Sequence, residues 1–257
     1  MPEAVTYRIE FLHAIEQLRQ CLDIQKAAWG YQDADLLPLR SLVVCTKIGG
    51  QVFGAVDDSE KVLGFLNAIP GYRDTRIYLH SQMMGVRPEY QNLGIGKRLK
   101  LAQREEALTR GINRIEWTFD PLEIRNARFN IGSLGVICRR YLVNTYGITS
   151  SRLHGGMPTD RLVAEWHLDN CRVKSVLGAA ESIGTKREVE AVVELPLEIE
   201  ELKSRDVMAA IQVQMEIRER ILDFFDKQLC ITGFEVDQTQ KKARYLFTPL
   251  ELDTPIS

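Results

Sequence analysis

The chain has 257 residues, with 33 Lys and Arg against 35 Asp and Glu, so its formal net charge is −2. This near balance argues against nucleic acid as the main partner, because nucleic-acid-binding domains usually carry a clear basic excess. Hydrophobic residues make up 45% of the chain, which is enough for a packed core and excludes disorder as the dominant state. No apolar run reaches the ~18–20 residues of a transmembrane helix, so no membrane partner is expected.

The cysteines and histidines indicate neither a disulfide framework nor a metal centre. The five cysteines are odd in number, widely spaced and never arranged as Cys-x-x-Cys, which is typical of reduced thiols. The N-terminus does not resemble a signal peptide, so we expect a cytoplasmic protein. The histidines form no zinc-like spacing with cysteine or with one another, so no metal ligands are predicted. They are His13, His80, His154 and His167.

The first 150 residues alternate between strand and helix patterns. Period-two alternation predicts a strand at 5–11, and helical spacing of apolar residues predicts a helix at 13–29. The apolar run 42–47 ends at Gly49-Gly50, which is a signal for a hairpin turn. Further strands are expected at 52–56, 62–69, 78–86, 112–119 and 136–143, and further helices at 97–109 and 126–134. This order is typical of the α/β or α+β class, with helices on the faces of a sheet.

The composition changes after residue 150. The segment 169–187 is polar and glycine-bearing and is interpreted as a loop. One long helix is predicted over 199–229, with an apolar stripe that we expect to be buried. The stripe consists of Met208, Ile211, Met215, Leu222, Phe225 and Leu229. Strands at 190–195, 233–236 and 244–247 complete a C-terminal β-α-β-β extension. We expect one domain at 1–155 and the extension, 156–257, packed on it.

The clearest chemical signal lies where the strand 78–86 leads into the helix 97–109. The connecting segment, residues 86–97, reads VRPEYQNLGIGK. A glycine loop that opens a helix presents unpaired backbone N–H groups at the positive end of the helix dipole, where phosphate binds. Glycine is needed because a Cβ would block close approach of the anion.

Two other phosphate-binding motifs do not fit this segment. A Walker P-loop needs glycine five residues before the Gly96-Lys97 pair and Ser or Thr after it, but those positions hold Gln91 and Arg98. A dinucleotide-binding fingerprint needs a third glycine, where the chain has Leu99. The basic residues that follow the loop are interpreted as a solvated helix face, although the first two could also attract a phosphate. They are Lys97, Arg98, Lys100 and Arg104.

The pattern Gln91-x-x-Gly94-x-Gly96, between a strand and a helix, resembles motif A of the GNAT acetyltransferase superfamily. The pattern alone is weak, since about 0.2 chance matches are expected in a chain of this length. The order of elements over 5–150 strengthens the resemblance, and YLHSQMMGV, WTFDPLE and TDRLVAEW are similar to a GNAT subgroup with a C-terminal extension. The resemblance implies a mixed, mostly antiparallel central sheet flanked by helices, and a catalytic domain at 1–155.

The resemblance also implies acetyl-CoA as the cofactor and a small-molecule amine as the acceptor. The pyrophosphate would lie on the loop backbone, and a backbone N–H of the preceding strand would bind the thioester carbonyl. Gly85 marks either the bulge that exposes this donor or a packing glycine. The asparagines at i,i+4 on the next helix would bind the pantetheine amides, or serve as helix caps. The expected cofactor-binding residues are Met84, Gly85, Val86, Gln91, Asn92, Leu93, Gly94, Ile95, Gly96, Lys97, Asn126 and Asn130.

A base is expected, because an ammonium group has no lone pair and must lose a proton before it attacks. Glu116 and Asp120 share one face of their strand, and His80 lies on the preceding strand. Each of these base candidates can equally be a structural residue. Many family members place a tyrosine acid on the next helix, but no tyrosine stands there in this chain. Tyr141, Tyr146 or water would then protonate the leaving thiolate.

The preferred function is an N-acetyltransferase in which the amine attacks the thioester directly. No cysteine lies in the two central strands, which argues against a covalent acyl-enzyme. The alternative is a non-catalytic sensor or scaffold that binds acyl-CoA, which the missing tyrosine keeps open. The long helix of the extension either closes the acceptor side or forms a homodimer surface, and the sequence does not decide between these.

Overall fold

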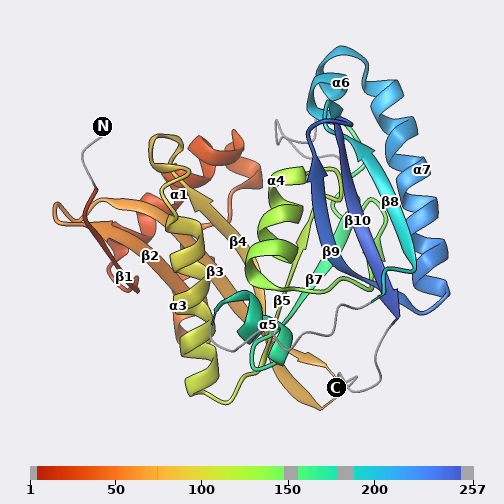
Figure 1. The fold of residues 1–257 in the computed structure, drawn as a ribbon. Helices are drawn as coiled ribbons and strands as arrows, with labels where there is room; N and C mark the ends of the chain where they lie inside the picture. The colour runs from red at the N-terminus through yellow and green to blue at the C-terminus, as the bar shows by residue number, and fades with distance from the viewer. Residues whose placement is uncertain (1–4, 74, 148–155, 179–187, 250–257) are drawn as a thin grey trace. The chain divides into compact units, whose positions relative to one another are not determined.

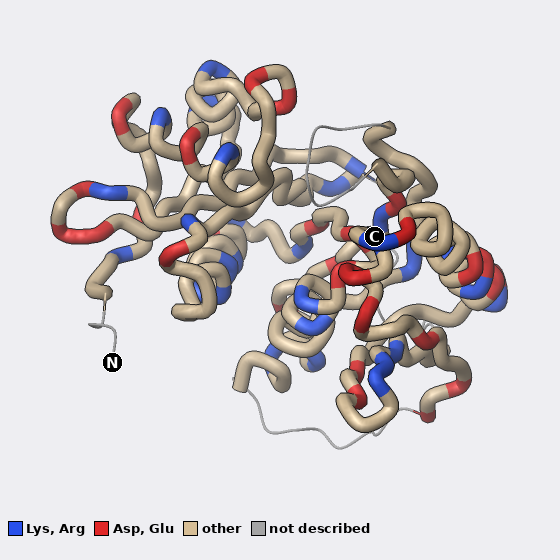
Figure 2. Tube along the Cα trace, turned by 90° about the horizontal axis from the view of Figure 1, so that it is seen from above, with Lys and Arg blue, Asp and Glu red and all other residues tan. Residues whose placement is uncertain are grey.

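The computed structural model describes residues 5–73, 75–147, 156–178 and 188–249 (Figure 1). These residues form two compact units. Unit 1 contains the described residues up to Ile115, and unit 2 contains those from Glu116 onward. This division by compactness differs from the domain boundary expected near residue 155, which stays a prediction. Acidic and basic residues both occur along the trace of each unit (Figure 2).

Unit 1 is built on an antiparallel meander. Strands β1 to β4 lie side by side in chain order, and each is antiparallel to the next. The elements of unit 1 are β1 (Tyr7–Phe11), α1 (Ile15–Trp29), η1 (Asp33–Asp35), α2 (Leu39–Lys47), β2 (Gln51–Asp57), β3 (Val62–Arg73), β4 (Arg76–Val86), η2 (Pro88–Tyr90) and α3 (Ile95–Thr109).

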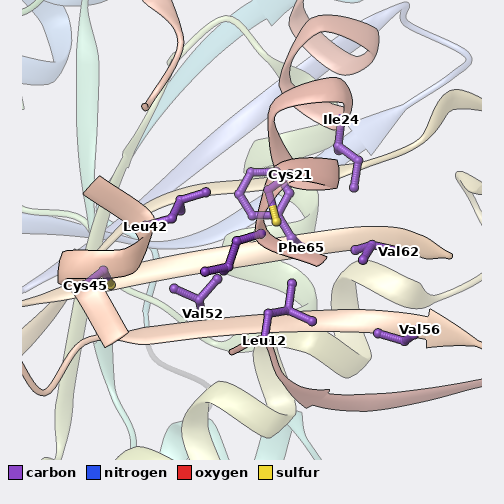
Figure 3. Close-up of a cluster of buried hydrophobic side chains, with 10 residues drawn as sticks. Leu12, Cys21, Ile24, Leu42, Cys45, Val52, Val56, Val62 and Phe65 are labelled. Atoms are coloured by element: carbon purple, nitrogen blue, oxygen red, sulfur yellow. The ribbon is translucent and has the colours of Figure 1, made fainter. Parts of the chain in front are cut away.

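Alternation along the strands gives unit 1 a hydrophobic cluster on each face of its sheet. Phe65 of β3 packs with Cys21 of α1 and Leu42 of α2 (Figure 3). Its neighbour Leu66 belongs to the second cluster, together with Leu99 of α3. The strands β3 and β4 are therefore covered by α1 and α2 on one side and by α3 on the other.

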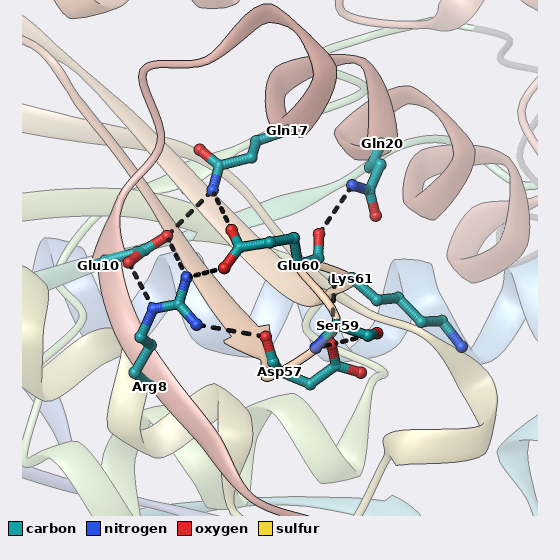
Figure 4. A network of polar contacts seen from close by, with 8 residues as sticks. All are labelled: Arg8, Glu10, Gln17, Gln20, Asp57, Ser59, Glu60 and Lys61. Atoms are coloured by element: carbon teal, nitrogen blue, oxygen red, sulfur yellow. Dashed lines mark hydrogen bonds and ion pairs between the residues drawn. The ribbon is translucent and has the colours of Figure 1, made fainter.

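The turn between β2 and β3 is connected to β1 by polar contacts. Arg8 donates from Nε to Glu10 at 2.8 Å and from Nη2 to Glu60 at 2.6 Å. Gln17 of α1 donates to Glu10 at 3.0 Å (Figure 4). Arg8 and Glu60 are exposed and Glu10 and Gln17 are half-buried, so the network contributes little to stability and mainly fixes the position of β1.

The apolar run 42–47 is helical, so the hairpin turn signalled by Gly49-Gly50 is wrong. α2 begins after Pro38 and buries Leu42 and Cys45, which lie three residues apart. The glycines at 49 and 50 do turn the chain, but from α2 into β2. A short apolar run fits a buried strand and a buried helix face equally well, and the proline just before the helix was the better signal.

Unit 2 contains two groups of strands. The first has the order β5-β7-β6, and the second is the antiparallel sheet β8-β10-β9. The elements are β5 (Arg114–Phe119), α4 (Ile124–Ala127), the π-helical turn η3 (Arg128–Ser133), β6 (Tyr141–Leu142), β7 (Arg161–His167), α5 (Cys171–Val176), β8 (Ala191–Pro196), α6 (Ile199–Arg205), α7 (Val207–Asp226), β9 (Leu229–Asp237) and β10 (Lys242–Pro249). The predicted mixed class, with mostly antiparallel strands and flanking helices, is confirmed.

The predicted long helix over 199–229 is in fact two helices. They separate at Asp206, whose backbone is extended (φ −150°, ψ 89°) and whose carboxylate accepts the Ala209 N–H at 3.0 Å. The predicted apolar stripe is wrong at Met208 and Met215, which are 70% and 41% exposed. The buried residues of α7 are instead Ala210, Gln214, Ile217 and Ile221. The stripe was misplaced because a polar residue, Gln214, occupies a core position and donates to Pro158 O at 3.0 Å.

Two further segments differ from the prediction. The interpreted loop 169–187 contains α5, which Asn170 caps by accepting the Arg172 N–H at 2.8 Å, while 179–187 lie outside the described residues. The stretch 136–143 forms only the short β6 and isolated bridges at Ile137 and Cys138. Within the described ranges, no helix has the length and apolar character needed to cross a bilayer, and no cluster of His, Cys, Asp and Glu could hold a metal.

Candidate functional site

The loop that joins β4 to α3 is fixed to the sheet at its start. Arg87 donates its backbone N–H to Leu63 O at 2.9 Å and its Nε to Val62 O at 2.8 Å. Gln91 donates Nε2 to Val86 O at 3.3 Å. The next three residues are exposed. The loop is therefore attached to β3 and β4 while its outer part faces solvent.

The outer part of the loop turns through left-handed backbone into α3. Asn92 has φ 65° and Gly94, the N-cap, has φ 78°. The first intrahelical bond runs from Arg98 N–H to Gly94 O at 3.1 Å. The backbone N–H groups of the three preceding residues, 95–97, therefore have no carbonyl one turn earlier to bind. These donors and the positive end of the helix dipole lie where the sequence predicts an anion site, which stays a prediction.

The two loop glycines differ in how far the fold requires them. Gly94 has a positive φ that other residues adopt at a cost. Gly96 has ordinary backbone, and a Cβ there would lie 3.4 Å from Met84 Cε, an ordinary contact. Packing within the protein does not require glycine at 96.

The bulge of β4 lies at Gln82, so the bulge proposed for Gly85 is wrong. The residues on either side of Gln82 have partners on β3, and the pairs are Asn67 with Met83 and Ala68 with Ser81. Gln82 has no opposite residue. Gly85, three positions further along, pairs in register with Phe65.

Gly85 is a packing glycine. A Cβ on it would lie 2.8 Å from Trp29 Cη2 and 3.2 Å from Ile24 Cγ2, both on α1. The glycine therefore lets α1 approach β4 closely. Sequence alone could not distinguish this role from a bulge, because both use glycine inside a strand.

A buried lysine connects α3 to the strand beside the bulge. Lys100 is 2% exposed, and its Nζ donates to Ser81 Oγ and to Gln103 Oε1, both at 3.0 Å. Gln103 donates in turn to Gln51 Oε1 at 3.1 Å. Burial lowers the pKa of Lys100 to about 7. The sequence analysis placed Lys100 on a solvated face, although its spacing from Gln103 and Ala107 matches the buried face of α3.

Glu116, a predicted base, takes part in a buried ion-pair cluster of unit 2. It is 2% exposed, and Arg140 Nη2 lies 2.8 Å from its Oε2. Arg140 Nε also donates to Glu165 at 3.1 Å, and Arg139 Nη2 lies 2.9 Å from the same carboxylate. Burial alone would raise the pKa of Glu165, but bonds from His167 and Arg139 lower it below its usual value. Glu116 therefore stands in a structural cluster, and its catalytic role stays a prediction.

Asp120, the preferred base, follows directly after β5. Its Oδ1 accepts the Leu122 N–H at 2.8 Å, and its Oδ2 lies 3.9 Å from Lys203 Nζ. Burial raises the pKa of Asp120, and the charge of Lys203 opposes that rise. One carboxylate oxygen therefore holds a turn, and the other faces an ammonium group.

Glu123 is a candidate base that sequence reasoning missed. Lys203 Nζ lies 3.8 Å from its carboxylate and 2.7 Å from that of Glu200. Burial raises the pKa of Glu123 to about 7, and the charges of Glu200 and Asp120 add to this rise. The position close after Asp120 was visible in the sequence, but the contact with Lys203, 80 residues further on, was not.

The two tyrosine candidates for the acid differ in environment. Tyr141 is 9% exposed and donates to Asp160 Oδ2 at 2.6 Å, and burial, followed by Asp160, raises its pKa. Asp160 is fully buried and also binds Arg218 at 2.7 Å. Tyr146 is 53% exposed, and its hydroxyl lies 3.0 Å from Thr118 Oγ1 of β5.

The remaining predicted residues lie in different surroundings. Asn126 is exposed, whereas Asn130 is 4% exposed and accepts the Trp117 Nε1 hydrogen bond at 3.3 Å. His80 is half-buried on β4, opposite Ile69. The loop residues and His80 belong to unit 1, and the carboxylates, asparagines and tyrosines named above belong to unit 2.

Comparison with known proteins identifies the first half of the chain. Residues 15–129 match the model of the Acetyltransferase (GNAT) family. Over this segment the chain is similar to the GNAT acetyltransferases. The match runs from α1 through the glycine loop and β5 to the start of η3. Tyr141, Asp160 and the C-terminal extension lie beyond it.

Solved acetyltransferase structures have a fold similar to part of this chain. Aminoglycoside 6'-acetyltransferase type Ii is 19% identical, with a TM-score of 0.51, and the match covers 63% of this chain and 98% of that one. The ribosomal-protein-S18-alanine N-acetyltransferase of Escherichia coli is 16% identical, with a TM-score of 0.50, and the match covers 63% of this chain and 94% of that one. NAA60 of Arabidopsis thaliana, solved with a bisubstrate analogue, is 15% identical, with a TM-score of 0.51, and the match covers 63% of this chain and 97% of that one. No curated protein sequence matches the chain.

Proposed function

We propose that the protein transfers the acetyl group of acetyl-CoA directly to an amine. The observation that carries the proposal is the α3 N-terminus, where the loop turns through Gly94 into the helix and the backbone N–H groups of 95–97 precede the first intrahelical bond. A bound pyrophosphate would accept hydrogen bonds from these donors. The GNAT family match supports acetyl-CoA as the molecule that carries the pyrophosphate.

The strand before the loop would hold the reacting end of the cofactor. Acetyl-CoA, when bound, supplies an activated acyl group whose carbonyl oxygen gains negative charge during attack. A backbone N–H between Met84 and Val86 would bind that oxygen and stabilise the charge without a dedicated side chain. No covalent acyl-enzyme is needed, because the amine itself supplies the nucleophile.

The base of the proposed reaction is drawn from the carboxylates that follow β5. A base works best when its pKa lies near the working pH, and burial raises the pKa of both Asp120 and Glu123. Glu116 is less suited, because Arg140 already binds its carboxylate. Asp120 stays the preferred base, since it directly follows the strand.

Tyr146 is better placed than Tyr141 to protonate the leaving thiolate. The Tyr141 hydroxyl is buried and already donates to the Asp160 carboxylate, which holds its proton in place. The Tyr146 hydroxyl is exposed beside β5 and can exchange its proton with solvent. Tyr146 is therefore the acid of the proposed reaction.

Calorimetry with coenzyme A tests the phosphate site. We expect Gly96→Val to melt cooperatively but to bind coenzyme A at least ~100-fold more weakly, because its side chain covers the backbone donors. Lys97→Ala is the matched control, and it should bind within a few-fold of wild type because the backbone provides most contacts. Near wild-type affinity in a folded Gly96→Val protein would contradict the proposal.

The alternative is a non-catalytic protein that binds acyl-CoA. The engagement of Glu116 by Arg140 and of Tyr141 by Asp160 favours it, since these predicted catalytic groups are committed to structure. Coenzyme A at 100 times its dissociation constant should stabilise either protein by about 2.7 kcal/mol. Stabilisation without thiol release on any amine would favour the alternative.

A further inference from the structure

A buried amide of β3 lies opposite the bulge of β4. Asn67 is fully buried, and its Nδ2 donates to Gln82 Oε1 at 2.8 Å. Its Oδ1 has no hydrogen-bond partner among the residues that the structure describes. A buried carbonyl oxygen without a partner costs about 1–3 kcal/mol, so cores rarely retain one. An apolar side chain would serve folding better at this position.

Other buried amides of unit 1 are fully hydrogen-bonded. Gln25 accepts the Leu37 N–H at 2.7 Å and donates to Leu37 O at 3.2 Å. Gln103 accepts from Lys100 and donates to Gln51. These amides hold loops and helices in place. Asn67 differs from them because its oxygen has no partner among the residues that the structure describes.

The Asn67 amide lies one hydrogen bond from the surface, through its Nδ2 and the Gln82 side chain. Gln82, its partner, is exposed, and in the described part of the chain the Gln82 side chain makes no other hydrogen bond. Bulges occur next to active sites, where they redirect a side chain. Ser81, beside Gln82, is bonded to Lys100. The strand backbone is therefore held while the Gln82 side chain can rotate outward.

Gln82 also lies close to the chemistry that the proposed function requires. It is two residues before Met84, where the stretch expected to bind the thioester carbonyl begins. Two residues of strand span roughly 7 Å, a distance that a bound acyl group and an incoming amine would occupy together. The unpaired oxygen therefore lies near the expected point of attack.

We propose that Asn67 and Gln82 form the docking point of the acceptor amine, with Asn67 Oδ1 accepting an N–H of the attacking nitrogen once Gln82 rotates outward. This inference rests on the proposed function. In the transfer, the nitrogen–carbon bond forms, the carbon–sulfur bond breaks, one nitrogen proton passes to the base and the thiolate leaves. The amine must be uncharged when it attacks. A neutral amide oxygen binds an N–H without favouring the ammonium form as a carboxylate would.

The test compares Asn67→Leu with the matched control Gln25→Leu. Urea unfolding, calorimetry with coenzyme A and thiol release from acetyl-CoA are measured on each. The probe acceptors are spermidine, kanamycin and a peptide that begins with alanine. We expect Asn67→Leu to unfold at the same or a higher urea concentration and to bind coenzyme A within twofold of wild type. Its KM for the active probe should rise at least tenfold. Gln25→Leu should unfold at lower urea and keep the wild-type KM.

The outcomes separate this inference from the proposed function. A wild-type protein that does not bind coenzyme A would refute the proposed function, and this inference with it. Coenzyme A binding with an unchanged acceptor KM in Asn67→Leu would overturn the docking role alone. Loss of stability in Asn67→Leu as large as in Gln25→Leu would show a structural amide and also overturn it. If the wild-type protein binds coenzyme A but acetylates none of the three probes, the docking role is overturned and only the cofactor binding of the proposed function stands.

Discussion

At the scale of single residues, Lys100 is the most unusual ionisable group of unit 1. Burial lowers its pKa from 10.5 to about 7. Between these values the unfolded chain binds a proton that the folded chain does not, so the unfolding free energy rises with pH. Below about pH 7 both states bind the proton, and this contribution is flat. Lysine at this position therefore destabilises the fold least at alkaline pH.

Lys100→Met should remove this pH dependence. We expect the wild-type unfolding free energy to rise, relative to Lys100→Met, by up to about 1.4 kcal/mol per pH unit between pH 7 and 10. Urea unfolding at several pH values measures the difference. Lys97→Met, on the exposed side of the same helix, is the control and should follow wild type. Parallel curves for wild type and Lys100→Met would show that Lys100 stays protonated in the fold.

Asp120 can be tested without disturbing its turn. Its Oδ1 accepts the Leu122 N–H, and the oxygen of asparagine accepts such a bond about as well. Asp120→Asn should therefore fold normally and bind coenzyme A, but lose ~10²-fold or more in turnover if Asp120 is the base. It should also lose the acidic limb of the pH–rate profile, because that limb reports protonation of the base. A loss of less than threefold in kcat would leave Asp120 with only its role in the turn.

At the scale of elements, the contact between α1 and β4 depends on Gly85. A Cβ there would lie 2.8 Å from Trp29 Cη2, so Gly85→Ala should destabilise unit 1 by about 1–3 kcal/mol. Gly132→Ala is the control, since a Cβ at 132 meets nothing within 4 Å. Urea unfolding compares the two variants. Unchanged stability of Gly85→Ala would show that α1 can move away from β4 without cost and would contradict the packing role of Gly85.

Elements with a local signal could be predicted from the sequence, and those that depend on distant contacts could not. β1 alternates with period two, β2 and β3 contain continuous apolar runs, and the glycine loop carries its own pattern, so these elements were found. The two helices α6 and α7 were merged because the Asp206 cap interrupts an otherwise continuous apolar pattern. α2 was missed because its six-residue apolar run has no distinguishing period.

In the candidate site, too, features with a local sequence signal could be predicted, and features that depend on distant contacts could not. The phosphate loop is contiguous in the chain and was recognisable from residues 86–97. The burial of Lys100, the contact of Glu123 with Lys203 and the unpaired oxygen of Asn67 arise only when distant segments pack together. No periodicity or motif in one segment reports them.

At the scale of the whole molecule, unit 2 combines residues from both sides of position 155. Trp117 packs edge-on against Trp166, with ring centroids 5.9 Å apart. Tyr141 and Asp160 form a further buried link. A fragment of residues 1–155 would lack β7 and these partners, so we expect it to be insoluble or to show no cooperative melting transition by circular dichroism. A soluble fragment that melts cooperatively would show that the extension is dispensable for folding.

The cluster of Glu116, Arg140 and Glu165 has a consequence for how the sequence can change through evolution. Glu116 and Glu165 are almost fully buried and share Arg140. Removing one member leaves an uncompensated buried charge, which costs about 3–5 kcal/mol, whereas replacing the whole set by apolar residues can be neutral. A protein with a single substitution in this cluster would be unstable, so selection would remove it before a second, compensating substitution could arise. These three positions and Arg139, which also pairs with Glu165, should therefore covary among descendants of this protein, being either all charged or all apolar.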